Sequence, residues 1–190
     1  MLEHDMAVVI SLLRGVNVGG HHKIKMEALR SLYDSLGLPD ALTYVQSGNV
    51  IFKTRERDLI RLGRRIEDGI ERTFGFRPHV IVRTPAELRN VIARNPFAKR
   101  RGIEPNRLLV TFLAGAPSPE ARDKAQNLKS DLEELRLEER EFYMYFRSGM
   151  ARPKLTWLTV EKVLQTPGTG RNWNTVTKLL EIAENLEASG

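Results

Sequence analysis

Three short stretches of the chain carry residue types suited to binding an anion, and the first follows an apolar run. Residues 12–26 read Leu-Leu-Arg-Gly-Val-Asn-Val-Gly-Gly-His-His-Lys-Ile-Lys-Met. Glycines allow positive φ and close backbone approach, and free N–H groups at a helix N-terminus attract anions. Cationic side chains add charge-assisted hydrogen bonds. We therefore predict ligand contacts at Arg14, Asn17, Lys23 and Lys25.

The spacing within this stretch matches neither the P-loop pattern nor the dinucleotide-binding fingerprint, and no lysine followed by Ser or Thr closes the loop. A tight strand-to-helix connection whose charges are merely solvated accounts for the same residues. Both interpretations stay open.

The second stretch, residues 168–178, reads Gly-Thr-Gly-Arg-Asn-Trp-Asn-Thr-Val-Thr-Lys. Asn172 suits the N-cap of a final helix, which would be a structural role. A cap does not require the polar residues around it. We predict that Arg171, Asn174 and Lys178 line the other side of one cleft, opposite loop 14–25.

The third stretch is Gln46-Ser47-Gly48-Asn49, between two β-rich runs. Turn chemistry explains Gly48 and Asn49 but requires neither Gln46 nor Ser47. We include Gln46, Ser47 and Asn49 among the predicted ligand-binding residues. Ser47 lacks the G-x-S-x-G elbow of a nucleophile.

Composition limits the chemistry. The 190 residues contain no cysteine, which excludes disulfides, thiolate chemistry and sulfur-ligated metals. The four histidines have no carboxylate at ligand spacing, so we expect no metal and no cofactor. The net charge of +6 favours an anionic partner, although basic residues are scattered and only Lys99–Arg101 form a dense run.

No apolar run approaches the roughly 20 residues of a membrane helix, and the N-terminus lacks a signal-peptide pattern. We therefore expect a cytoplasmic protein without membrane contact. Residues 1–5 look like a polar extension.

Periodicity in the first half predicts a strand at 7–13, a helix at 26–36, a hairpin of 43–45 with 50–52, a helix at 59–74 and a strand at 78–82. This order is the split βαβ unit of ferredoxin-like folds. A short helix from Pro85 to Ile92 follows.

The second half repeats this outline after a polar boundary at 98–106. We expect a strand at 107–114, a strand–turn–strand unit within 136–146 and a helix at 155–164, with no final strand. Another helix opens at Pro117-Ser118-Pro119, and its inward face would be Ala121, Ala125, Leu128, Leu132 and Leu135. Tyr143 and Tyr145 share one strand face, where they would either pack or stack on nucleic-acid bases.

The predicted fold class is therefore α+β, with two ferredoxin-like halves related by pseudo-duplication and a C-terminal helix. The halves are residues 1–97 and 107–190, which we expect to form one compact unit. Each half has a sheet with one face covered by helices and another face that needs burial.

Several of these motifs together resemble the mainly bacterial domain of unknown function 1697. The resemblance covers about Met6 to Leu180 and rests on residues 12–20, Lys25-Met26, 43–50, Asn95-Pro96-Phe97 and 171–179. It implies duplicated ferredoxin-like halves and brings no established activity. Members usually carry a Gly-x-Gly-Arg-Ser-Lys-Leu-like segment. Here Pro153 replaces the serine, so a hydroxyl there cannot be essential to any function this chain retains.

Our leading hypothesis is a protein that binds a nucleotide-like or phosphorylated small molecule. One alternative is a nucleic-acid-binding module that uses the basic surface and an exposed sheet. Another is an enzyme acting on a phosphorylated substrate, with no catalytic residue assigned. A structural role, through a sheet edge that pairs two copies, is a further alternative.

Overall fold

The computed structural model describes residues 6–130, 133–150 and 155–189. The predicted N-terminal extension, Leu132 and Pro153 lie outside the described residues. The chain divides into two compact units, which are Met1–Arg89 with Lys178–Gly190 (unit 1) and Asn90–Thr177 (unit 2). The predicted division into residues 1–97 and 107–190 stays a prediction.

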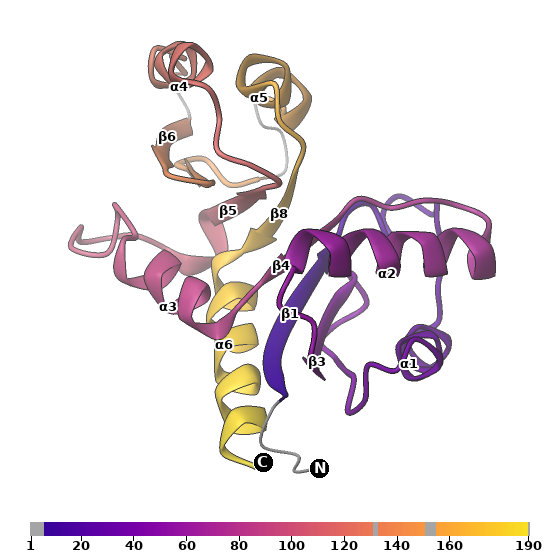
Figure 1. Cartoon of the computed structure of the whole chain (residues 1–190). Helices are drawn as coiled ribbons and strands as arrows, with labels where there is room; N and C mark the ends of the chain where they lie inside the picture. The colour runs from indigo at the N-terminus through magenta and orange to yellow at the C-terminus, as the bar shows by residue number, and fades with distance from the viewer. Residues whose placement is uncertain (1–5, 131–132, 151–154, 190) are drawn as a thin grey trace. The chain divides into compact units, whose positions relative to one another are not determined.

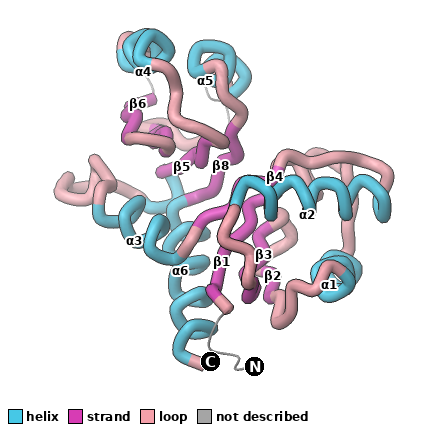
Figure 2. Tube along the Cα trace, viewed as in Figure 1, coloured by secondary structure: helices cyan, strands magenta, loops and turns pink. Residues whose placement is uncertain are grey.

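Unit 1 contains a four-stranded antiparallel sheet with strand order β2-β3-β1-β4. Its strands are β1 Ala7–Leu13, β2 Leu42–Thr43, β3 Asn49–Thr54 and β4 Val80–Arg83. The central strand β1 is buried from Val8 onward, which is why its sequence is a continuous apolar run. The predicted hairpin is confirmed, with a very short β2 at the sheet edge (Figure 2).

Helices α1 Met26–Ser35 and α2 Leu59–Phe74 cover one face of this sheet (Figure 1). Their apolar faces pack on strand residues such as Val9 and Phe52 in one core. The side chain of Asp58 caps α2 by accepting from the N–H groups of its first turn, and the helix ends at Gly75, whose φ is 78°. Both helices therefore begin and end close to the predicted residues.

Unit 2 contains a second four-stranded antiparallel sheet with strand order β6-β7-β5-β8. Its strands are β5 Leu108–Leu113, β6 Glu133–Glu138, β7 Glu141–Phe146 and β8 Gly168–Asn172. The expectation that this half lacks a final strand is wrong, because β8 pairs with β5. Its sequence, Gly-Thr-Gly-Arg-Asn, has no apolar alternation to reveal a strand.

Tertiary packing explains the glycine that opens β8. A Cβ added at Gly168 would lie 2.8 Å from Thr111 Cγ2 and 2.8 Å from Trp157 Cζ2. Only glycine lets the backbone approach this closely. The strand is therefore specified by what packs against it and not by its own pattern.

The helices of unit 2 also correct the sequence analysis. Helix α4 ends at Gln126, and Leu135 lies in strand β6, so the predicted helix to Leu135 is wrong. The leucines after Gln126 keep the spacing of a helix, but this spacing does not determine the structure. Residues 133–138 form a strand because they pair with β7. The remaining elements are α3 Pro85–Ala93, η2 Pro105–Arg107, α4 Pro119–Gln126, α5 Trp157–Leu164 and α6 Trp173–Ala188.

The fold is thus a mixed α+β architecture with two four-stranded antiparallel sheets and, within the described ranges, six α-helices. In the stretches that the structure covers, no helix is both long and apolar enough to cross a membrane.

Candidate functional site

Two of the three predicted segments lie against each other in unit 1. The N–H of Leu13 donates to the carbonyl of Gly48 at 2.8 Å, and the side-chain amide of Asn17 donates to the carbonyl of Gln46 at 2.9 Å. A Cβ at Gly48 would come within 2.8 Å of Leu13 Cβ, so this contact requires glycine. Loop 14–25 and turn 46–49 therefore form one continuous surface.

Asn17 shapes the loop from within. Its Oδ1 accepts from the N–H of Ile24 at 2.8 Å, while its Nδ2 donates to the carbonyls of Ile24 and Gln46. Its φ of 56° lies in the left-handed region, which asparagine tolerates better than most residues. The side chain predicted to contact a ligand thus holds the two ends of the loop together.

The tip of the loop is a tight turn. Val18 and His21 form an isolated β-bridge around Gly19 and Gly20, whose φ values are 60° and 80°. The Nδ1 of His22 lies 3.3 Å from the carbonyl oxygen of Gly15, and the His22 ring stacks on Phe76, which lies between α2 and β4. These contacts give an exposed loop a defined shape.

The two lysines of the loop have different surroundings. Lys23 is exposed, and its ammonium group has no partner among the residues that the structure describes. Lys25 immediately precedes α1 and lines a cavity of about 500 Å³ between α1 and the end of α2, beside Ser31, Ser35 and Thr73.

Turn 46–49 is closed by Asn49, which is buried and donates to the carbonyl of Tyr44 at 3.1 Å and to Ser47 Oγ at 3.0 Å. Gln46 is exposed. The residues of α6 from Lys178 onward belong to unit 1 as well. The Lys178 ammonium bonds Glu181 at 2.7 Å, which raises the pKa of Lys178, and the Tyr44 phenol adds a smaller shift in the same direction.

Sequence reasoning missed a carboxylate–histidine pair beside this loop. The N–H of Arg14 donates to the carbonyl of His79 at 2.9 Å, so the two residues are neighbours where β1 ends and β4 begins. The Nδ1 of His79 lies 3.2 Å from Oε1 of Glu67, a buried residue of α2. The Nε2 of His79 is buried and has no hydrogen-bond partner within the described part of the chain.

Glu67 is held by three groups. Besides His79, it accepts from the N–H of Val80 at 2.9 Å and from Arg77 Nη2 at 3.0 Å. Arg77 also bonds the carboxylates of Asp68 and Glu71, and these bonds raise the pKa of its guanidinium. No spacing signal could have found the pair, because its members lie on different elements.

The third predicted segment begins in unit 2. Arg171 lies in β8 and is buried, and its Nη1 donates to Thr169 Oγ1 at 2.7 Å and to the carbonyl of Gly170 at 2.8 Å. Burial lowers the pKa of Arg171 to about 10. The predicted cap is confirmed, since Asn172 Oδ1 accepts from the N–H of Asn174 at 3.0 Å. A common cleft for segments 14–25 and 168–178 stays a prediction.

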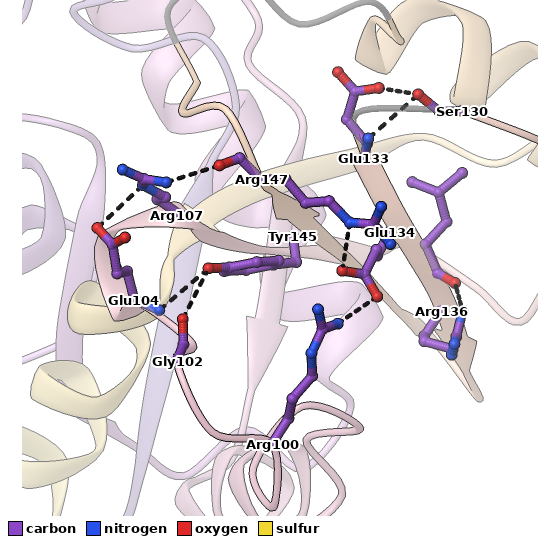
Figure 3. Close-up of polar contacts among 11 residues, drawn as sticks. Arg100, Gly102, Glu104, Arg107, Ser130, Glu133, Glu134, Arg136, Tyr145 and Arg147 are labelled. Carbon is purple, nitrogen blue, oxygen red and sulfur yellow. Dashed lines mark hydrogen bonds and ion pairs between the residues drawn. The ribbon is translucent and has the colours of Figure 1, made fainter.

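A polar network in unit 2 ties the segment before β5 to β6 and β7 (Figure 3). Glu134 accepts from Arg100 and, at 2.9 Å, from Arg147, and these bonds hold the pKa of its carboxyl below the usual range. The Tyr145 hydroxyl donates to the carbonyl of Gly102 at 3.4 Å. The basic run 99–101 is thus partly engaged in holding the fold.

The aromatic strand β7 packs inward on both faces. Tyr143 and Tyr145 are 1% and 5% exposed. The Tyr143 hydroxyl donates to the carbonyl of Val91 at 2.8 Å, and burial raises its pKa well above the ordinary value. The packing interpretation of these rings is confirmed, so they offer no stacking platform for nucleic-acid bases.

Within the described ranges, no group of three or more His, Asp or Glu side chains is placed to hold a metal ion.

Comparison with known proteins gives a family and a fold. No curated protein matches the chain. The solved structure of the conserved bacterial protein SP0830 from Streptococcus pneumoniae matches with a TM-score of 0.70 and 22% identity, over 94% of this chain and 99% of that chain. A family model described as a protein of unknown function (DUF1697) matches residues 6–143. Since this match spans well over half of the sequence, the chain belongs to the DUF1697 family.

Proposed function

We propose that this protein binds a small phosphorylated or nucleotide-like anion on the unit 1 surface formed by loop 14–25 and turn 46–49. The observation that carries the proposal is a loop that is fixed by its own hydrogen bonds and whose tip is exposed. The N–H groups of Gly19 and Gly20 have no partner among the described residues, and both glycines are exposed. Successive exposed amides and nearby cations form an anion-binding concavity.

Preorganisation supports this proposal energetically. Because the bonds of Asn17 already fix the loop, a ligand would not have to order it, and ordering is a main cost of binding. Arg14 and Lys23 supply positive charge at the two ends of the loop, whereas the Lys178 ammonium is already paired with Glu181 and adds little net charge beside the turn. A polyphosphate suits such a spread of donors.

Calorimetric titration with ATP and with inorganic pyrophosphate tests the proposal. Lys23→Ala should weaken binding about tenfold, the loss expected when one charge-assisted contact is removed. Arg72→Ala is the matched control, since Arg72 is an exposed cation at the end of α2. The proposal fails if neither compound gives a saturable signal, or if both variants weaken binding equally. Asn174→Ala measures any contribution of segment 168–178.

Nucleic acid is the alternative partner, and the same titration at two salt concentrations distinguishes the two. A bound strand displaces many counterions, so its affinity falls steeply with salt, whereas ATP binding at one loop should depend on salt more weakly. We place the protein in the cytoplasm, and the absence of cysteine supports this inference.

An enzymatic function is a second candidate, favoured by the Glu67–His79 pair. A carboxylate at Nδ1 favours the tautomer whose Nε2 lone pair can accept a proton, and this buried Nε2 would have to become accessible for a substrate to reach it. The pair adjoins Arg14, which would hold a phosphorylated substrate. If ATP is turned over, His79→Gln should lower kcat about 100-fold or more and leave the ATP affinity unchanged. Equal losses in affinity and rate would assign His79 a structural role.

We also infer that both units are ferredoxin-like and related by pseudo-duplication. The element order strand–helix–strand–strand–helix–strand occurs in each unit, and each sheet has its second strand at one edge and its fourth at the other. Such agreement in order and pairing supports a repeated split βαβ unit.

A further inference from the structure

We propose that unit 1 has a second anion site, a pocket at the opposite end of β1 that binds an organic phosphate monoester. A cavity of about 550 Å³ opens there, and the lining residues that matter are Met6, Pro39, Thr54, Arg55, Glu56 and Arg65. Met6 precedes β1 and Arg14 follows it, so the seven-residue strand separates this pocket from loop 14–25 by roughly 20 Å.

The walls of the pocket are tied to one another. The end of β3 is fixed by its pairing with β1, where Thr54 faces Ala7. The segment after α1 is held against β3, because the N–H of Lys53 donates to the carbonyl of Pro39 at 3.4 Å. Together these contacts give the cavity a defined shape before any ligand arrives.

Arg65 connects α2 to the same wall. Its Nη2 donates to the carbonyl of Leu36, at the end of α1, over 2.7 Å. This bond fixes the guanidinium at the cavity and uses one of the five N–H donors that it carries. The remaining donors are available to a ligand at little cost in side-chain entropy.

Arg55 brings a second guanidinium, which is exposed and has no hydrogen bond or ion pair among the described residues. The one carboxylate of the lining, Glu56, is already engaged. Its Oε1 accepts from the N–H of Asp58 at 3.0 Å, and its Oε2 lies 3.9 Å from Nε of Arg61. The pocket therefore presents a net positive charge to its contents.

This combination indicates the class of ligand. Guanidinium groups pair with phosphate through parallel N–H···O bonds, and a dianionic phosphate has enough acceptor oxygens for two of them. Met6 and Pro39 add apolar surface for an organic group on the ester. The volume lies within the range of small-molecule sites.

Phenyl phosphate and inorganic phosphate are the probes, titrated into the full chain by calorimetry. Phenyl phosphate should bind saturably and more tightly than inorganic phosphate, because only the ester covers the apolar surface. Arg55→Ala and Arg65→Ala should each weaken phenyl phosphate binding about tenfold. Arg64→Ala is the matched control, since Arg64 is the exposed neighbour of Arg65 on α2 and does not line the cavity.

Two further readouts keep the test decisive. Arg65→Ala also removes the hydrogen bond to the carbonyl of Leu36, so it could weaken binding by altering the fold. Arg55→Ala removes no such bond, so a loss of affinity in this variant reports the loss of a ligand contact. Lys23→Ala should leave phenyl phosphate binding unchanged, which separates this pocket from the loop site. The proposal is overturned if phenyl phosphate does not bind saturably, if Arg64→Ala weakens binding as much as the lining variants, or if only Arg65→Ala has an effect.

Discussion

At the scale of single residues, Asn17 shows that a polar side chain in a candidate site can have a structural role. The sequence analysis predicts Asn17 as a ligand contact, and in the structure its side chain makes three hydrogen bonds within unit 1. In the proposed site its contribution would be indirect, since it fixes the loop that carries the exposed donors. A sequence pattern identifies the polar residue but not the atoms that it bonds.

Glu134 offers a test of electrostatics at the scale of one residue. Its hydrogen bond from Arg100, with a second from Arg147, lowers the pKa of its carboxyl in the folded state. The unfolded value is about 4.3, so these bonds stabilise the fold above that pH, and the stabilisation is lost as the pH falls through the folded-state pKa.

Glu134→Gln should therefore lower the melting temperature at pH 7 by about 2–4 °C, which corresponds to roughly 1 kcal/mol. The deficit should shrink when melting is followed down to pH 3. Asp123→Asn, on helix α4 of the same unit, is the control, because the Asp123 carboxylate is exposed and makes no hydrogen bond or ion pair with the described residues, so this variant should change the melting temperature little. A deficit that is constant from pH 7 to pH 3 would contradict the assignment.

At the scale of elements, β8 depends on a close approach that only glycine permits. Gly168→Ala would place a methyl group 2.8 Å from Thr111 Cγ2 and 3.0 Å from the carbonyl oxygen of Phe112. We expect a loss of about 1–3 kcal/mol in the free energy of unfolding, the usual cost of overpacking, measured by urea denaturation.

Gly115→Ala provides the comparison within unit 2, because an added Cβ there meets no atom within 4 Å. This variant should keep the stability of the unmodified protein. Equal stability of the two variants would show that β8 tolerates displacement from β5.

At the scale of the whole molecule, unit 1 is built from two segments that are separated in the sequence by unit 2. The chain leaves unit 1 after Arg89, forms unit 2, and returns to unit 1 at Lys178 within α6. Lys178 and Tyr44 thereby belong to the same unit and interact electrostatically, although they lie far apart in the sequence. The two proposed anion sites also belong to unit 1, at opposite ends of β1, so each can be removed without touching the other.

The sequence by itself determined the local elements of this protein. Apolar periodicity placed β1, α1 and α2 close to their observed bounds, and turn residues placed the hairpin, because these signals act between neighbours in the chain. Composition excluded cysteine chemistry, and the family motifs predicted the family. The glycine-rich loop was identified as a candidate site from its residue types alone.

Only the tertiary structure decided which polar residues meet. In the folded chain Glu67 contacts His79, and Arg55 and Arg65 line one cavity. Tyr143 is buried, and β8 pairs with β5. Each of these features depends on contacts between different elements, and those of Tyr143 and β8 join residues far apart in the sequence. Such contacts leave no local pattern, because the energy that selects them comes from packing and pairing across the fold and not from the preferences of neighbouring residues.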